Sequence, residues 1–104
     1  MSAGKINLKI IRHLVKTGRY SVRQHAHQRM IERDIFTDDI ENVILLGEVV
    51  ETDQHNKPLP TCLLMNFVCS QPLYVVCALS KNWVYIITVY WFDPSKWINP
   101  WIKR

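Results

Sequence analysis

The chain has 104 residues, of which 48% are hydrophobic, and its formal net charge at pH 7 is +4. This length suffices for one hydrophobic core and is too short for two, and the composition excludes a disordered chain. No stretch approaches the roughly 18 apolar residues of a membrane-spanning helix, and lysines interrupt the apolar N-terminal stretch, which argues against a secretory signal. We therefore expect a cytoplasmic protein with a single domain over residues 1–104.

The charges are unevenly distributed along the chain. Residues 1–33 hold eight Lys and Arg against one acid, Glu32, whereas residues 34–53 hold seven acids and no Lys or Arg. A basic surface of this kind suits a polyanion such as a nucleic acid. The alternative is that the two segments simply pair with each other in the fold.

The cysteines are odd in number and lack the spacing of metal ligands. We expect them to be buried free thiols and not disulfides or a zinc site. They are Cys62, Cys69 and Cys77.

The first predicted element is a helix that ends at Gly18. Apolar residues recur at helical spacing between Ile6 and Val15 and form one face. The opposite face carries basic residues at positions i, i+4, i+7 and i+11. We expect this basic stripe to bind RNA phosphates; it consists of Lys5, Lys9, Arg12 and Lys16.

Two further helices are expected before residue 48. One covers roughly residues 23–33, with Ser21 or an adjacent residue near its cap. The other begins at Thr37, where acidic residues follow that favour the positive end of a helix, and it ends at Gly47.

From Glu48 onward the pattern changes to short runs of β-branched and aromatic residues. The runs EVVETD, TCLLMNFV, PLYVVCALS and WVYIITVYWF predict four antiparallel strands joined by short turns. The expected fold class is α+β, with the N-terminal helices packed on one face of a four-stranded antiparallel sheet.

The last of these strands is apolar on both of its alternating sets. Strict alternation places Thr88 and Tyr90 on the same side as Val84 and Ile86. Because the helices explain only one apolar face, the other face calls for a cleft, a partner or a central strand buried on both sides.

The second helix carries His25, Arg29 and Arg33 at i, i+4 and i+8, which places them in one stripe. The stripe lies beside the buried face, where a site would be built, although such a stripe is more often solvated than catalytic. His27 lies about 200° from His25 at about 100° per residue, so we expect it to face solvent.

The stretch SVRQHAHQRMIERDIFTDDIENVILLGEVVE resembles the signature of a bacterial family catalogued as domain of unknown function 4258. The stretch IITVYWFDPSKW resembles the closing pattern of the same family, so the resemblance covers nearly the whole chain. One departure is Tyr74, at a strand position where many members have histidine. The matching residues are His25, Ala26, Arg29, Met30, Arg33, Ile35, Gly47, Glu48, Thr88, Tyr90, Asp93, Pro94 and Trp97.

The resemblance implies a small α+β fold of the RelE/barnase/EndoU/colicin type and a toxin of a toxin–antitoxin pair. It implies RNA as the substrate and a cognate antitoxin, of the zinc-finger kind in some relatives, as a partner. The expected reaction is metal-independent cleavage of RNA by attack of a ribose 2′-OH on its own phosphate. The alternative is a non-catalytic module with the same fold that binds RNA or a protein.

Such a reaction needs a proton acceptor, a proton donor to the leaving oxygen and fixed cations around the phosphate. His25 can transfer protons near neutral pH, and Arg29 and Arg33 offer planar donors for phosphate oxygens. Tyr90 is the candidate to orient the phosphate or to donate a proton, with Thr88 on the same strand face.

Aromatic side chains near the end of the chain offer stacking surfaces for unpaired bases, and Trp91 is the candidate for RNA binding. We expect at least two of Trp91, Trp97 and Trp101 to serve the core or to dock the C-terminal residues instead. The sequence predicts no cofactor and no metal site, because the acids lie mostly in the third helix and the first long strand. It leaves the oligomeric state and the RNA target open.

Overall fold

The computed structural model describes residues 6–104, and the three helices and four long strands lie where the sequence predicts them. The class is α+β. In the described part of the chain, no helix has the length and apolar character needed to cross a membrane. In chain order the elements are α1 (Leu8–Lys16), β1 (Tyr20–Val22), α2 (Gln24–Arg33), α3 (Thr37–Leu46), β2 (Glu48–Asp53), β3 (Thr61–Val68), β4 (Gln71–Leu79), β5 (Val84–Trp91), β6 (Trp97–Asn99) and β7 (Ile102–Lys103).

The main sheet is mixed and has five strands in the order β1-β5-β4-β3-β2, so the expected four-stranded antiparallel sheet is wrong. Strands β2 to β5 do form an antiparallel meander. The additional strand, β1, runs parallel to β5 and pairs Tyr20 with Val84. Three residues are too few to show alternation, which is why β1 escapes detection in the sequence. Ser21, expected near the cap of α2, lies in this strand.

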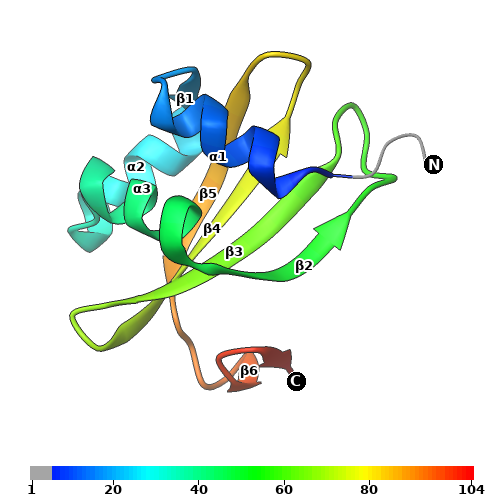
Figure 1. The fold of residues 1–104 in the computed structure, drawn as a ribbon. Coiled ribbons are helices and arrows are strands. Elements are labelled where there is room, and N and C mark those ends of the chain that lie inside the picture. The colour runs from blue at the N-terminus through cyan, green and yellow to red at the C-terminus, as the bar shows by residue number, and fades with distance from the viewer. Residues whose placement is uncertain (1–5) are drawn as a thin grey trace.

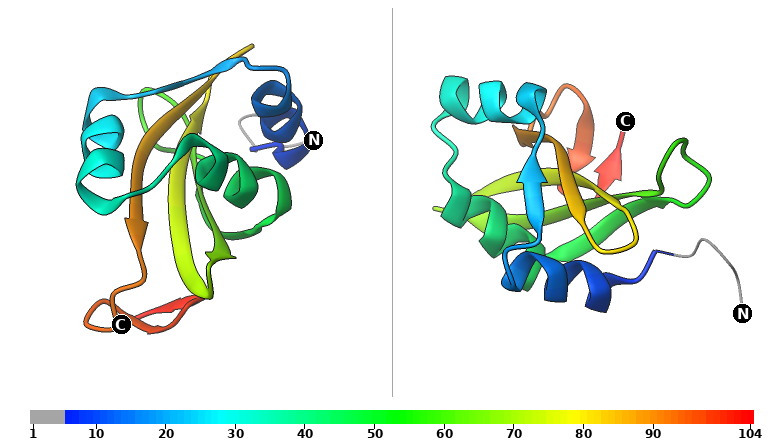
Figure 2. Two further views of the ribbon diagram at one scale, coloured as in Figure 1. Left: turned by 90° about the vertical axis from the view of Figure 1, so that its left-hand side faces the viewer. Right: turned by 90° about the horizontal axis from the view of Figure 1, so that it is seen from above.

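The helices lie together on one face of the sheet, here called the helix face (Figures 1 and 2). The larger hydrophobic cluster joins buried residues of all three helices to alternate residues of β3, β4 and β5. The segment after β5, residues 92–104, turns away from the helices and is here called the C-terminal segment (Figure 1). The helices therefore leave the opposite face, here called the second face, to this segment.

Backbone contacts set the ends of α2 and α3. The N–H of Arg23 donates to the carbonyl of Ile86 at 3.0 Å, which ties the start of α2 to β5 without a side-chain cap. At the start of α3, the N–H of Phe36 donates to Asp39 Oδ2 at 2.9 Å. Gly47 ends α3 in a tight place, because a Cβ there would collide with the carbonyl oxygen of Met65.

Arg12, which the sequence assigns to the RNA-binding stripe, holds the C-terminal end of α3. Its Nε donates to the carbonyl of Ile44 at 2.9 Å and its Nη2 donates to that of Gly47 at 2.7 Å. These carbonyls lie at the negative end of the helix and lack helical N–H partners. Of the other stripe residues, Lys9 and Lys16 are exposed, and Lys5 lies outside the described residues.

A β-bulge in β5 overturns the strict alternation expected for this strand. Val76 pairs with Thr88 and Cys77 pairs with Ile86, so Ile87 is left over in the ladder. The extra residue puts Val84, Ile86 and Val89 together on the helix face. Tyr90, with Thr88, consequently faces the second face.

The C-terminal segment packs on the second face through Tyr74. The ring of Tyr74 stacks between those of Tyr90 and Trp97, with centroids 5.1 and 4.6 Å away. Its hydroxyl donates to the carbonyl of Pro100 at 2.7 Å. Tyr74, at the position where the resemblance expects histidine, therefore docks the C-terminal segment.

Two tryptophans serve this docking, as the sequence predicts. Trp97 is buried in the smaller hydrophobic cluster on the second face. Trp101 donates from Nε1 to Glu48 Oε2 at 2.6 Å and lies edge-on to Phe67.

Neither of the two ion pairs among residues 6–104 joins the basic N-terminal segment to the acidic segment. Arg29 pairs with Glu32, and Lys103 pairs with Glu51. The structure therefore does not support mutual neutralisation of the two segments through salt bridges.

The three cysteines are free thiols, as expected, but not all of them are buried. Cys62 and Cys77 face each other across β3 and β4 and are buried. Cys69 is exposed in the turn that joins these strands, where its φ is 51°.

Candidate functional site

An open hollow of about 730 Å³ lies between the end of β5, the last turn of α2 and the C-terminal segment. We call it the first hollow. Its volume is typical of a small-molecule or nucleotide site. Its lining includes the cations Arg33, Lys96 and Lys103 and the aromatic residues Tyr90, Trp91, Phe92 and Trp97.

Arg33 reaches the first hollow from the end of α2 and is anchored to β5. Trp91 donates from Nε1 to the carbonyl of Arg33 at 3.1 Å. The Nη1 of Arg33 donates to the carbonyl of Val89 at 3.4 Å, which is long and therefore weak. Most of the five guanidinium N–H groups thus remain available to a ligand.

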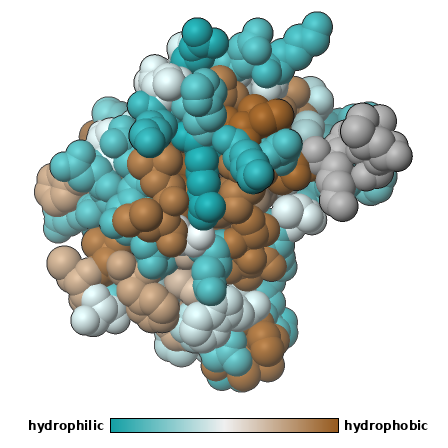
Figure 3. Space-filling model, viewed as in Figure 1, coloured by the Kyte–Doolittle hydropathy of each residue, from teal (hydrophilic) through white to brown (hydrophobic). Residues whose placement is uncertain are grey.

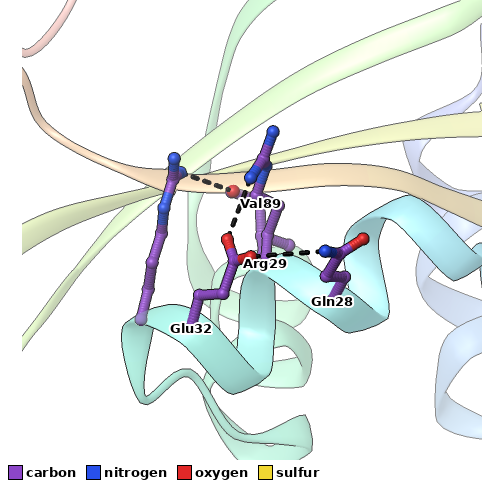
Figure 4. A network of polar contacts seen from close by, with 5 residues as sticks. Gln28, Arg29, Glu32 and Val89 are labelled. Carbon is purple, nitrogen blue, oxygen red and sulfur yellow. Dashed lines mark hydrogen bonds and ion pairs between the residues drawn. The ribbon is translucent and has the colours of Figure 1, made fainter.

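Arg29 is engaged by an acid of its own helix (Figure 4). Its Nη1 lies 2.9 Å from Glu32 Oε1, and Gln28 donates to the other carboxylate oxygen at 3.4 Å. Arg29 does not line the first hollow. Its guanidinium is therefore partly neutralised.

His25 also lies outside the lining of the first hollow, exposed in the first turn of α2. His25 and Arg33 share a stripe, but eight residues separate them by about 12 Å along the helix axis. Of the three stripe residues, the structure brings only Arg33 into the same hollow as Tyr90. Thr88 shares the strand face of Tyr90 without lining this hollow. The catalytic roles of all five candidates, His25, Arg29, Arg33, Thr88 and Tyr90, remain predictions.

Tyr90 stands between two hollows. It lines the first hollow and also a second one of about 510 Å³, which contains Glu51 and Asp53 of β2. Burial raises the pKa of the Tyr90 hydroxyl, and the negative charge of Glu51 raises it further. The phenol therefore stays protonated at neutral pH and can donate a hydrogen bond or a proton.

Lys103 is the other residue common to both hollows. Its Nζ lies 3.0 Å from Glu51 Oε1 and 5.6 Å from the ring centroid of Trp97. The side chains of Lys103 and Glu51 are 51% and 48% exposed, so both remain accessible to a ligand.

Sequence reasoning missed Lys96, Lys103 and Glu51. Residues 94–104 contain basic residues and no acid, a signal that was available. No local sequence pattern, however, predicts that this segment folds back across the sheet, because its docking depends on the contact between Tyr74 and Trp97.

Asp93 is the acidic residue in the lining of the first hollow, and its carboxylate is bound within its own loop. Its Oδ1 accepts hydrogen bonds from the N–H and the hydroxyl of Ser95 at 2.9 and 2.7 Å. These bonds lower the pKa of the carboxyl group. Of the three cations in the lining, Lys103 is paired with Glu51, and Arg33 and Lys96 against this single acid leave the first hollow positive.

Within residues 6–104, no three His, Cys, Asp or Glu side chains gather closely enough to hold a metal ion.

Residues 22–91 match the family described as Domain of unknown function (DUF4258). The match runs from the last residue of β1 to the end of β5 and includes Arg33, Glu51 and Tyr90. It stops before the C-terminal segment that supplies Lys96 and Lys103. No curated protein and no solved structure matches the chain.

Proposed function

We propose that this chain, which belongs to the DUF4258 family, is an endoribonuclease of the toxin type that cleaves RNA without a metal ion. In this reaction a ribose 2′-OH attacks the adjoining phosphate and leaves a cyclic phosphate and a free 5′-OH. The observation that carries the proposal is the first hollow, where Arg33, Lys96 and Lys103 line the same open cavity as Tyr90.

The chemistry of the hollow suits a phosphodiester. Arg33 offers planar paired donors to phosphate oxygens, and the two lysines add positive charge. Cations that are already in place when the charge develops stabilise a transition state by several kcal/mol. The half-buried rings of Trp91 and Phe92 offer faces on which unpaired bases stack.

The relationship to the RelE/barnase/EndoU/colicin ribonucleases and the antitoxin partner are part of this proposal. Their support is the order of the elements together with the family match: the three helices, with only the short strand β1 among them, precede an antiparallel meander.

The test is incubation of the purified chain with a defined single-stranded RNA in the presence of EDTA. We expect cleavage that leaves 2′,3′-cyclic phosphate and 5′-OH ends. A Tyr90→Phe variant purified in parallel controls for contaminating nucleases and should cleave at least about 10-fold more slowly. Intact RNA after incubation with the wild-type protein would contradict the proposal.

A second candidate is a binding module without catalysis, and one surface favours it. Ile31 and Phe36 are 68% and 67% exposed and line a hollow of about 260 Å³ where α2 meets α3. Figure 3 shows further hydrophobic residues exposed among hydrophilic ones on the side of the molecule drawn there. Exposed apolar side chains around a hollow are typical of protein-binding sites. A mobility shift of RNA, or capture of a partner protein, without any cleavage would support this candidate.

A further inference from the structure

We infer that Glu51 is the general base of the proposed reaction, oriented by Lys103, and that the scissile phosphate sits at the boundary between the two hollows. This inference rests on the proposed function and names a catalytic residue that the stripe of α2 does not contain.

Two β-bulges aim Glu51 and Tyr90 at the same face of the sheet. The register of β2 on β3 shifts between Val49 and Glu51, so that Glu51 pairs with Leu63, a residue of the second face. The bulge of β5 at Ile87 turns Tyr90 to that face as well. Without the bulge in β2, strict alternation would place Glu51 on the helix face, and without the bulge in β5 it would place Tyr90 there. Bulges that re-aim a side chain are common beside active sites.

Lys103 holds the carboxylate of Glu51 where the nucleophile would arrive. The ammonium lies 3.0 Å from one carboxylate oxygen, which leaves the other oxygen free to accept a proton. The charged or titratable groups that face Glu51 are Lys103, Tyr90 and Asp53, which line the second hollow with it.

The two hollows match the two sides of an in-line displacement. A phosphate at the boundary would contact Tyr90 and Lys103, which line both hollows. Its 2′-OH side would then face Glu51 in the second hollow, and its leaving side would face Arg33 in the first hollow. His25 lines neither of these hollows, so its imidazole is poorly placed to take the proton.

The proton transfers balance within these residues. Glu51 takes the proton of the 2′-OH while the bond from the 2′ oxygen to phosphorus forms. The bond from phosphorus to the 5′ oxygen breaks, and that oxygen takes the proton of the Tyr90 hydroxyl. Glu51 then returns its proton to the Tyr90 oxygen, which restores both groups.

The test compares the cleavage rates of wild type, Glu51→Gln and Asp38→Asn on one single-stranded RNA in EDTA. Glutamine still accepts a hydrogen bond from Lys103 but is not basic, so we expect a loss of at least about 100-fold. Tryptophan fluorescence should stay unchanged, because the C-terminal segment remains docked. Asp38→Asn removes an exposed carboxylate of α3 and should stay within about threefold of wild type.

The dependence of the wild-type rate on pH gives an independent readout. A carboxylate base predicts a rate that falls only below about pH 5, whereas a histidine base predicts a fall near pH 6.5. If Glu51→Gln changes the fluorescence, Glu51→Asp should keep the segment docked and recover part of the rate. Full activity of Glu51→Gln, or a fall near pH 6.5, overturns the role of Glu51 and leaves the proposed function standing. A wild-type protein that does not cut RNA overturns both.

Discussion

The hydroxyl of Tyr74 donates to the carbonyl of Pro100 at 2.7 Å, and this bond ties β4 to the C-terminal segment. The segment supplies Lys96 and Lys103 to the first hollow. A residue of the buried sheet thus positions two cations that belong to the proposed site.

The first prediction concerns this bond. Tyr74→Phe keeps the stacked rings but removes the donor, so the free energy of unfolding should fall by about 1 kcal/mol, as measured in urea. Limited proteolysis should cut the C-terminal segment faster than in wild type. If the segment is equally protected in both proteins, the ring stack alone holds it.

The second prediction concerns alkaline pH. Burial, with a smaller contribution from Tyr90, raises the pKa of Tyr74 to about 12. The unfolded chain ionises Tyr74 near pH 10, so the folded state loses stability as the pH rises from about 10 to about 12. Titration of stability across this range should show a smaller loss for Tyr74→Phe than for wild type, and equal losses would contradict the assignment.

The third prediction separates Arg12 from the other residues of the basic stripe. Arg12→Met leaves the last carbonyls of α3 without their donors, so the free energy of unfolding should fall by about 2 kcal/mol. Lys9→Met, on an exposed position of the same helix, should change it by less than about 0.5 kcal/mol. Similar values for the two variants in urea would show that the contacts of Arg12 contribute little. The RNA-binding role of Lys9 and Lys16 remains a prediction.

The fourth prediction concerns phosphate recognition. Arg33→Lys keeps a positive charge at the first hollow but loses the planar pair of donors, so the rate of RNA cleavage should fall at least about 10-fold. Arg29→Lys is the matched control, because Arg29 is engaged by Glu32 and does not line the hollow. Equal losses of activity in the two variants would contradict the role of Arg33 in phosphate recognition.

The fifth prediction concerns the histidines of α2. His25→Ala should reduce the cleavage rate by less than about 10-fold, because His25 does not line the first hollow. His27→Ala should match wild type, since His27 is exposed, as the sequence predicts. A loss of 100-fold in His25→Ala alone would return the proton transfer to His25 and remove it from Glu51.

The sequence predicts those parts of the fold that depend on local patterns. The helix ending before Gly18 and the helix starting at Thr37 show apolar residues at helical spacing, and the four long strands correspond to short runs rich in β-branched and aromatic residues. Parts that depend on distant contacts were not predicted. The pairing of Tyr20 with Val84 and the bulge at Ile87 leave no local pattern.

The same limit applies to the prediction of the candidate site. Arg33 belongs to a helical stripe, which is a local feature, but the face on which Tyr90 lies depends on the bulge at Ile87. The catalytic roles of both residues remain predictions. Helical spacing places His25 and Arg33 on the same side of α2, but it also separates them by about 12 Å along the helix axis. Glu51 and Lys103 meet only after the C-terminal segment crosses the second face.

The parallel pairing of β1 with β5 has a consequence for synthesis on the ribosome. Tyr20 lies opposite Val84, and 64 positions separate them in the chain. Because the ribosome adds about 5–20 residues per second, β5 is synthesised roughly 3 to 13 s after β1. During that interval the apolar faces of α1 and α2 have no strand of β5 to cover them. The nascent chain therefore leaves part of these apolar faces open to a chaperone for several seconds.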